Sequence, residues 1–388
     1  MKPDGTRKEN DCPASVGADA GQPSQCNNTN ITETTEDRNY DFEDNEEYMQ
    51  KLQRLQDPTI LNTITYNELM DEVLPDRRVV IEGMMSTGAY LLAGAPKIGK
   101  SFLVAQIAYH VSTGKELWGN VVHSGTVLYL ALEDDKKRLQ ERMARMFGVE
   151  GTDQLHFATE AGLIGQGLDK QLENFIREHP DTALVIIDTL QKIREVAGDG
   201  YSFASDYDVI GKLKHVADSY NLCILIVHHT RKQASTDKYD QISGTRGLLG
   251  AADGGIIMDT EKRSSGTANL ELTGRDHPPQ ILYLNKNQET LIWELDHAET
   301  EVWKDPPDPI LEKIKSIVTI ENPYWEGTPT ELAELLEVDM APNHLSRRLN
   351  VSSGRLRAEA HICYTRVKTH ASRVIQLTYY VEEPITTN

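Results

Sequence analysis

The sequence predicts an α/β fold built on a parallel sheet covered by helices, with an antiparallel extension and a smaller domain after it. Three observations support this expectation. Near-continuous apolar runs alternate with helical patterns from residue 90 to about 295, which is typical of strands buried on both faces. The last four runs follow one another closely, so we expect them to pair antiparallel. A proline-rich stretch at residues 304–310 then reads as a linker.

Composition divides the chain into three parts, at residues 1–58, 59–303 and 304–388. The first part is rich in Asn, Thr, Asp, Glu and Ser and poor in large apolar residues, so we expect a disordered acidic tail. Its acidic run could dock a partner, although a solvated tail is the simpler interpretation. A short helix that ends at Pro75 is expected to begin the ordered core.

The core elements are predicted in order from periodicity and turn residues. Helical patterns over residues 100–114, 134–148 and 208–221 lie between strands. The strand candidates are residues 90–94, 126–132, 155–159, 183–188, 222–229, 254–259, 268–274, 280–285 and 290–295.

The part after the linker is expected to form a small winged-helix-like domain. Thr328, Pro329 and Glu331 match a capping box that begins a helix. Further helix is expected over residues 343–350 and 352–362. Alternating apolar residues after these helices, over 362–370 and 372–380, predict a hairpin.

The charge and cysteine content narrows the functional classes. A net charge of −20 argues against a protein that coats nucleic acid by bulk attraction. Residues 343–375 nevertheless hold seven basic side chains and one acidic one. The four cysteines show no metal-binding spacing, and no apolar run is long enough to span a membrane. We therefore expect a reduced, cytoplasmic protein without membrane association.

A phosphate-binding loop is predicted where the first core strand meets a helix. Residues 94–101 satisfy the GxxxxGK[ST] pattern in full, and the strand–helix context makes a chance glycine-rich turn the weaker alternative. Lys100 is expected to reach the β- and γ-phosphates of ATP, and Ser101 to hold Mg²⁺. The expected nucleotide-binding residues are Gly94, Ala95, Pro96, Lys97, Ile98, Gly99, Lys100, Ser101 and Phe102.

Polar residues at the ends of three other strands complete the predicted catalytic set. Asp188 ends an apolar strand and is the expected carboxylate near the magnesium ion. Thr189 follows it and cannot act as a base, so we expect Glu133 to orient the attacking water; helix capping is the alternative for Glu133. His229 is expected to contact the γ-phosphate, with His228 packing or hydrogen bonding beside it.

Residues 60 to about 295 resemble the RepA-like subgroup of RecA-fold hexameric ATPases of the AAA family, which includes plasmid replicative helicases. The matching stretches, in order, are residues 88–108, 128–135, 185–190 and 227–232. The resemblance implies a RecA-like P-loop NTPase core, a homo-hexameric ring with ATP between subunits, and an arginine finger supplied in trans.

Arg275 is the candidate finger, and an exposed arginine in a turn is the alternative. DnaB-type relatives usually carry a lysine two residues before the finger, where this sequence has Thr273.

The resemblance also implies that two loops after core strands project into the ring channel. Lys232, Lys238 and Arg246 could then follow the backbone of single-stranded DNA. The arginines of the last domain would suit duplex DNA, or would be merely exposed if the domain contacts protein. These residues are Arg347, Arg348, Arg355 and Arg357, joined by Arg366, Lys368 and Arg373 in the expected hairpin.

The sequence thus favours an ATP-dependent DNA helicase or translocase of RepA type, active in plasmid, phage or mobile-element replication. A replication initiator or loader is the expected further partner. Two alternatives stay open: an ATPase that remodels DNA or a protein without separating strands, and a DNA-binding adaptor controlled by nucleotide.

Overall fold

The computed structural model describes residues 59–61, 63–194, 203–229, 245–260, 265–300, 307–368 and 373–380. Within these ranges the side chains of residues 203–206, 245–247, 368 and 373 are not described. The chain forms two compact units, one of Met1–Asp76 with Pro307–Asn388 and the other of Arg77–Pro306. No helix in the described ranges combines the length and the apolar character needed to cross a bilayer.

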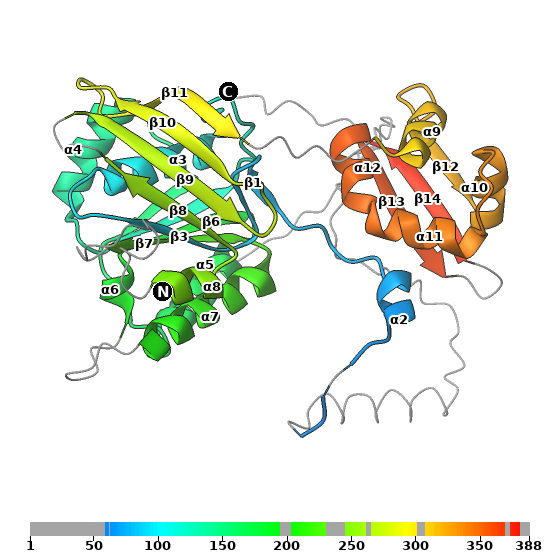
Figure 1. Cartoon of the computed structure of the whole chain (residues 1–388), viewed down its shortest axis with the longest axis horizontal. Helices are drawn as coiled ribbons and strands as arrows, with labels where there is room; N and C mark the ends of the chain where they lie inside the picture. The colour runs from blue at the N-terminus through cyan, green and yellow to red at the C-terminus, as the bar shows by residue number, and fades with distance from the viewer. Residues whose placement is uncertain are drawn as a thin grey trace, which may run out of the picture. The chain divides into compact units, whose positions relative to one another are not determined.

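The larger unit is organised around a nine-stranded sheet with the order β11-β10-β9-β8-β3-β7-β6-β4-β5 (Figure 1). The strands from β5 to β8 pair in parallel, and β9, β10 and β11 extend the sheet antiparallel, as predicted. Their bounds are β3 Gly88–Gly94, β4 Thr126–Ala131, β5 Leu155–Ala158, β6 Thr182–Asp188, β7 Cys223–His229, β8 Gly254–Asp259, β9 Thr267–Gly274, β10 Gln280–Lys286 and β11 Trp293–Thr300.

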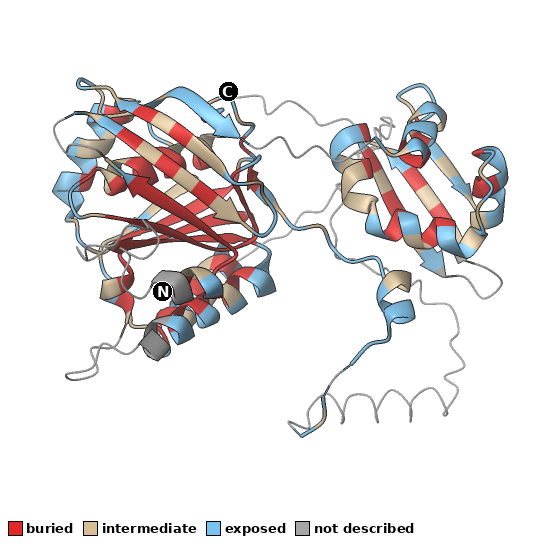
Figure 2. Ribbon diagram, viewed as in Figure 1, coloured by how far each residue is buried: buried red, intermediate tan, exposed pale blue. Residues whose placement is uncertain are grey.

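Alternate strand residues face two separate apolar layers, one on each side of the sheet. Leu92 of β3 belongs to the layer that includes α3 (Lys100–Thr113) and α4 (Lys136–Phe147). Its neighbour Leu91 belongs to the opposite layer. The helices that contribute to that layer are α5 Leu168–Glu178, α6 Leu190–Ile193, α7 Phe203–Tyr220 and α8 Thr245–Ala251. Burial is therefore concentrated in the central strands (Figure 2).

The strand order determines which strand ends lie side by side. β7 separates β3, which leads into the phosphate loop, from β6, which ends in Asp188. β4 follows β6, so the carboxyl ends of four parallel strands meet along one edge of the sheet. A short hairpin of β1 (Val79–Ile81) and β2 (Met85–Ser86) precedes β3 and was not predicted.

The smaller unit contains a three-stranded antiparallel sheet with the order β12-β14-β13. The expected capping box at Thr328 and Glu331 is present, and the three predicted helices and the hairpin are confirmed. Helix α9 and strand β12 were not predicted. The elements are α9 Pro309–Ile317, β12 Tyr324–Gly327, α10 Pro329–Leu335, α11 Pro342–Val351, α12 Ser353–Ala360, β13 Ile362–Lys368 and β14 Arg373–Tyr379.

The short helix α2 (Tyr66–Asp71) belongs to the smaller unit, whereas the sequence boundaries group it with the core. It has no buried residue and is held by polar contacts. The Asp71 carboxylate pairs with Arg347 at 2.8 Å, and the Met70 carbonyl accepts from Asn350 at 2.9 Å. Contacts between residues so far apart in the chain leave no local sequence signal.

Trp293 joins the antiparallel extension to α3, and its removal should destabilise the larger unit. The residue is 2% exposed. Its backbone N–H donates to the Gln106 side-chain oxygen, and its backbone carbonyl accepts from the Gln106 side-chain nitrogen. Trp293→Ala should lower the free energy of unfolding by about 3–5 kcal/mol. Calorimetry of the full chain would measure this, with Val149→Ala, at a 93% exposed site, as the control. An unchanged transition in Trp293→Ala would contradict the assigned packing.

Candidate active site

The phosphate loop adopts a conformation that depends on its glycines. Gly99 has φ 105° immediately before α3, and a Cβ there would lie 2.7 Å from Trp293 Cζ2. A Cβ on Gly94 would lie 2.5 Å from the Met258 carbonyl oxygen. Lys97 also has a positive φ of 66°. The resulting turn ends at the amino terminus of a long helix, the arrangement that binds phosphate groups.

Lys100 is a buried cation held against the loop. Its Nζ donates to the Gly94 carbonyl at 2.7 Å and to the Ala95 carbonyl at 2.8 Å, and the residue is 4% exposed. Burial lowers the Lys100 pKa to about 8, against the opposing effects of Asp188 and Glu133. The amine is therefore stabilised by two carboxylates that come from other strands.

Asp188, the carboxylate expected near the magnesium ion, lies buried beside Ser101. Burial raises its pKa, and hydrogen bonds from the Ser101 and Tyr129 hydroxyls oppose that rise. The Tyr129 hydroxyl donates to Asp188 Oδ2 at 3.1 Å. Tyr129 was not predicted, because its β4 position reads only as part of an apolar strand.

Glu133 lies directly beyond β4 and faces the same edge of the sheet. Its Oε1 accepts from the Thr189 hydroxyl at 3.2 Å, and its Oε2 lies 3.6 Å from His229 Nε2. The N-cap of α4 is Asp135, so the capping alternative does not apply to Glu133. Thr189 is fully buried and orients Glu133, a role that the sequence analysis missed.

The two adjacent histidines of β7 have different surroundings. His229 faces Glu133, and its Nδ1 is buried without a hydrogen-bond partner among the described residues. His228 Nδ1 lies 3.3 Å from the Gln191 amide, in line with the hydrogen-bonding role expected for it. His229 is thus the histidine that lies beside Glu133, and its contact with the γ-phosphate stays a prediction.

The loop opens into a pocket of about 360 Å³ that contains further cationic and aromatic residues. Lys286 Nζ lies 3.7 Å from the centre of the Phe102 ring, and Arg142 also lines the pocket. Burial, followed by repulsion from Arg145 and Arg142, lowers the Lys286 pKa. Arg142, Lys286 and Trp293 were not predicted, because only the folding of α4 and the antiparallel extension brings them to the loop.

The residues present fit a magnesium–nucleotide complex better than an ion bound by protein alone. Among the described residues no cluster of three or more His, Cys, Asp or Glu could hold a metal. Ser101 and Asp188 offer two oxygen groups at the loop, and Mg²⁺ commonly combines so few protein oxygens with substrate phosphates and water.

Arg275 lies at the opposite end of the strands from the phosphate loop of its own chain. Gly254 of β8 pairs with Tyr90 of β3 on one side and with Gly274 of β9 on the other, so Gly274 is level with Tyr90. The phosphate loop begins at Gly94, four residues further along β3, which is roughly 13 Å at 3.3 Å per residue. The Arg275 side chain is 60% exposed, and its Nη1 lies 3.6 Å from Asp253 Oδ1. It therefore cannot contact a phosphate bound in its own loop.

The candidate DNA-binding residues of the core fall largely outside the described structure. Lys232 and Lys238 lie outside the described residues. Arg246 lies in α8, but its side chain is not described.

Three described arginines of the smaller unit form ion pairs, and two others contact an aromatic ring or a backbone carbonyl. Arg348 Nη2 lies 3.0 Å from Asp308, and Arg355 Nε lies 2.8 Å from Glu359. Arg347 pairs with Asp71 as described above. Arg357 packs over the Tyr380 ring, and Arg366 donates to the Asp71 carbonyl. Any contact of these residues with DNA must compete with partners inside the unit.

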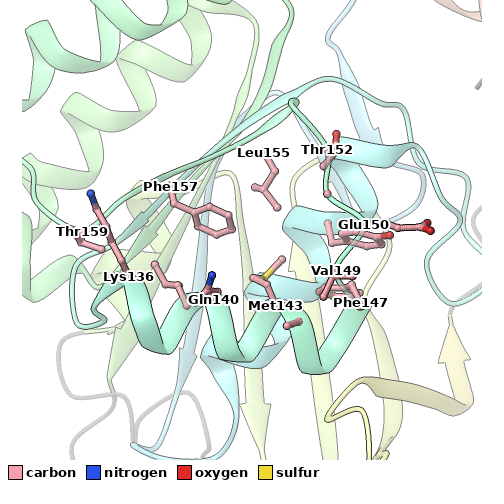
Figure 3. A pocket seen from close by; sticks show the side chains of 15 residues that line it. Lys136, Gln140, Met143, Phe147, Val149, Glu150, Thr152, Leu155, Phe157 and Thr159 are labelled. Atoms are coloured by element: carbon pink, nitrogen blue, oxygen red, sulfur yellow. The ribbon is translucent and has the colours of Figure 1, made fainter. Parts of the chain in front are cut away.

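A second pocket, of about 470 Å³, lies at the β5 edge of the sheet. Figure 3 shows side chains of α4 and β5 pointing into it, among them Met143 and Phe157. It shares no lining residue with the pocket at the phosphate loop. We therefore assign it no part in the candidate active site.

Comparison with known proteins finds one domain family and several partial relatives. The sequence pattern of a family described as an AAA domain matches residues 56–235. The DNA repair protein RadA of Streptococcus pyogenes serotype M6 is 24% identical over 276 residues, covering 67% of this chain and 55% of RadA. RadA of Halalkalibacterium halodurans is 26% identical over 294 residues, covering 74% of this chain and 54% of that protein. The chain thus spans little more than half of these relatives.

Among solved structures, that of a DnaB-like replicative helicase aligns with a TM-score of 0.45 and 14% identity, over 54% of this chain and 57% of that chain. The larger unit is thus an α/β domain with a phosphate-binding loop, and over residues 56–235 the chain is similar to the family described as an AAA domain.

Nucleotide affinity should fall as the pH rises above the Lys100 pKa of about 8. Below that pH the amine is already charged, so phosphate binding requires no proton. Above it, binding must take up one proton, and the apparent affinity should fall by up to about ten-fold per pH unit. Calorimetry of ADP binding at about pH 7 and about pH 9, in buffers of different ionisation enthalpy, measures that proton.

Lys100→Arg serves as the control for this pH dependence, because an arginine stays charged throughout the range. Equal affinity of the wild-type protein at both pH values, with no proton uptake, would contradict the assignment.

Thr189→Val should reduce ATP hydrolysis while leaving nucleotide binding intact. The substitution preserves shape at a fully buried position but removes the bond that orients Glu133. We expect a loss of about ten-fold in the steady-state rate, a fraction of what a positioned base contributes. Thr182→Val, at the other end of β6, is the matched control. A Thr189→Val rate equal to the control rate would show that Thr189 does not orient Glu133.

Proposed function

We propose that the chain is an ATP-dependent motor acting on DNA, a ring-forming helicase or translocase of RepA type. The observation that carries this proposal is the convergence of Lys100, Asp188 and Glu133 at one edge of the sheet. A protein that only binds nucleotide needs the first two. The third, an oriented and 45% exposed carboxylate, favours hydrolysis.

In the proposed reaction, the oxygen of a water molecule attacks the γ-phosphorus while Glu133 accepts a proton from that water. The bond between the γ-phosphorus and the β–γ bridging oxygen breaks in the same step. Lys100 leaves the Gly94 and Ala95 carbonyls to contact phosphate oxygens. Ser101 and Asp188 would hold Mg²⁺, which would supply charge neutralisation when bound with ATP. His229, beside Glu133, senses the γ-phosphate.

The proposed site is completed by Arg275 of a neighbouring subunit. Its distance from its own phosphate loop and its exposure both support action in trans. A head-to-tail contact of this kind repeats around a closed ring, for which we propose a homo-hexamer. An arginine delivered in this way stabilises the charge that develops on the transferred phosphoryl group.

DNA is the proposed partner, with the single strand in the ring channel near Lys232, Lys238 and Arg246. The similarity to proteins named for DNA repair supports a DNA substrate. Duplex contact by the smaller unit is the weaker part of the proposal, because Arg347, Arg348 and Arg355 already have carboxylate partners. Replication of a plasmid, phage or mobile element, with an initiator or loader as partner, is the proposed setting.

The similarity to a protein named for DNA repair is equally compatible with a second candidate, an ATPase that remodels DNA without separating strands. A tailed duplex distinguishes the two functions. A helicase releases the labelled strand in an ATP-dependent reaction, whereas the remodelling enzyme hydrolyses ATP on the same substrate and releases none.

The proposed motor function is tested by ATP hydrolysis with and without single-stranded DNA. We expect strong stimulation of the wild-type rate, and a loss of about 10²- to 10⁴-fold in Glu133→Gln with nucleotide binding retained. The conservative Glu141→Gln, on the exposed face of α4, is the control. A Glu133→Gln rate close to wild type would overturn the mechanism, and hydrolysis indifferent to DNA would overturn the DNA motor.

A further inference from the structure

A buried carboxylate lies beside the candidate arginine finger, at the junction of four elements. Asp253 lies between α8 and β8, and its side chain is 1% exposed. Its oxygens accept from Lys214 of α7, at 2.6 Å each, and from the Ala89 N–H of β3 at 3.0 Å. Arg275, after β9, lies 3.6 Å from Oδ1.

Asp253 contacts Arg275 through both its backbone and its side chain. The Arg275 N–H donates to the Asp253 carbonyl at 2.9 Å, which fixes the point where the chain leaves β9. The guanidinium lies near the carboxylate but beyond hydrogen-bond distance, and most of it is exposed. Several of its N–H donors therefore remain available to an outside phosphate.

Lys214 explains why Arg275 is not captured by its own subunit. A buried carboxylate with no other cation would draw an arginine into a close bidentate pair. Here Lys214 occupies both oxygens and neutralises most of the charge. The carboxylate can reach this position because residue 88 is glycine, where a Cβ would lie 2.6 Å from Asp253 Oδ2.

We propose that Asp253, with Lys214 as its counter-ion, is a positioning residue that holds Arg275 ready for the nucleotide site of the neighbouring subunit. The inference rests on the proposed role of Arg275 in trans. It adds that the position of the finger is set from inside the subunit that donates it.

Mixed rings can separate this role from a general effect on folding. Lys100→Ala inactivates the phosphate loop but keeps the finger, and Arg275→Ala does the reverse. Mixing the two full-length variants should restore ATP hydrolysis at interfaces that combine an intact loop with an intact finger. Asp253→Asn is then added to one partner at a time.

The expected result is an asymmetric loss. Asp253→Asn in the Lys100→Ala chain, which donates the finger, should reduce the restored rate by about ten-fold or more, since small misplacements of a catalytic group are costly. The same substitution in the Arg275→Ala chain, whose finger is already absent, should change the restored rate by less than about two-fold. Equal losses in both arrangements, or no loss in either, would overturn the proposal.

Two further variants test the same inference without Asp253→Asn, in case that variant fails to fold. Lys214→Met removes the cation that holds both Asp253 oxygens and leaves the carboxylate free to pair closely with Arg275, so it should show the same asymmetry. Asp218→Asn removes the other carboxylate near Lys214, at 3.1 Å, and should leave the restored rate unchanged in both arrangements. A symmetric effect of Lys214→Met would overturn the proposal even if Asp253→Asn does not fold.

The mixture without Asp253→Asn tests the proposed role of Arg275 by itself. Restored hydrolysis in Lys100→Ala plus Arg275→Ala supports action in trans. The effect of adding Asp253→Asn to one partner or the other then tests only the role of Asp253. No restored hydrolysis would overturn both.

Discussion

The burial of Lys100 is the constraint on which the active site depends. A cation removed from water must have carbonyl or carboxylate groups close by, and the loop alone supplies only the Gly94 and Ala95 carbonyls. The opposing charges come from Asp188, the last residue of β6, and from Glu133, just beyond β4. They meet Lys100 because the carboxyl ends of parallel strands lie along one edge of the sheet. The strand order therefore controls the electrostatics of the loop.

A second charged cluster lies at the opposite ends of the same strands. β3 connects the two: Gly94 opens the phosphate loop at one end, and Ala89 contacts Asp253 at the other. Each end is incomplete alone under the proposed mechanism, because the loop lacks an arginine finger and the finger lacks a phosphate. In the proposed mechanism, a head-to-tail contact between copies would bring the two ends together, and such contacts form a ring when the rotation between copies closes. The length of the strands would then separate the two halves of the proposed site.

The smaller unit shows how composition can overstate a basic surface. The run of arginines after residue 343 has little acidic sequence around it, so it reads as a patch for phosphate. In the fold, Asp71 and Asp308 arrive from other segments and pair with Arg347 and Arg348. Such pairs add little stability when exposed, but they lower the charge available to DNA. Free charge depends on neighbours in space, which residue counts do not contain.

The sequence by itself determined the features that depend on local spacing. The phosphate loop, Asp188 at the end of its strand and the nine strands of the core follow from periodicity and from glycine and lysine at fixed positions. Only the tertiary structure decided what lies next to these features. Thr189 beneath Glu133, Lys286 over Phe102 and Asp253 beside Arg275 are contacts across strands and layers. The physical reason is that a hydrogen bond or ion pair requires proximity in space, and proximity between distant segments follows from strand order and packing.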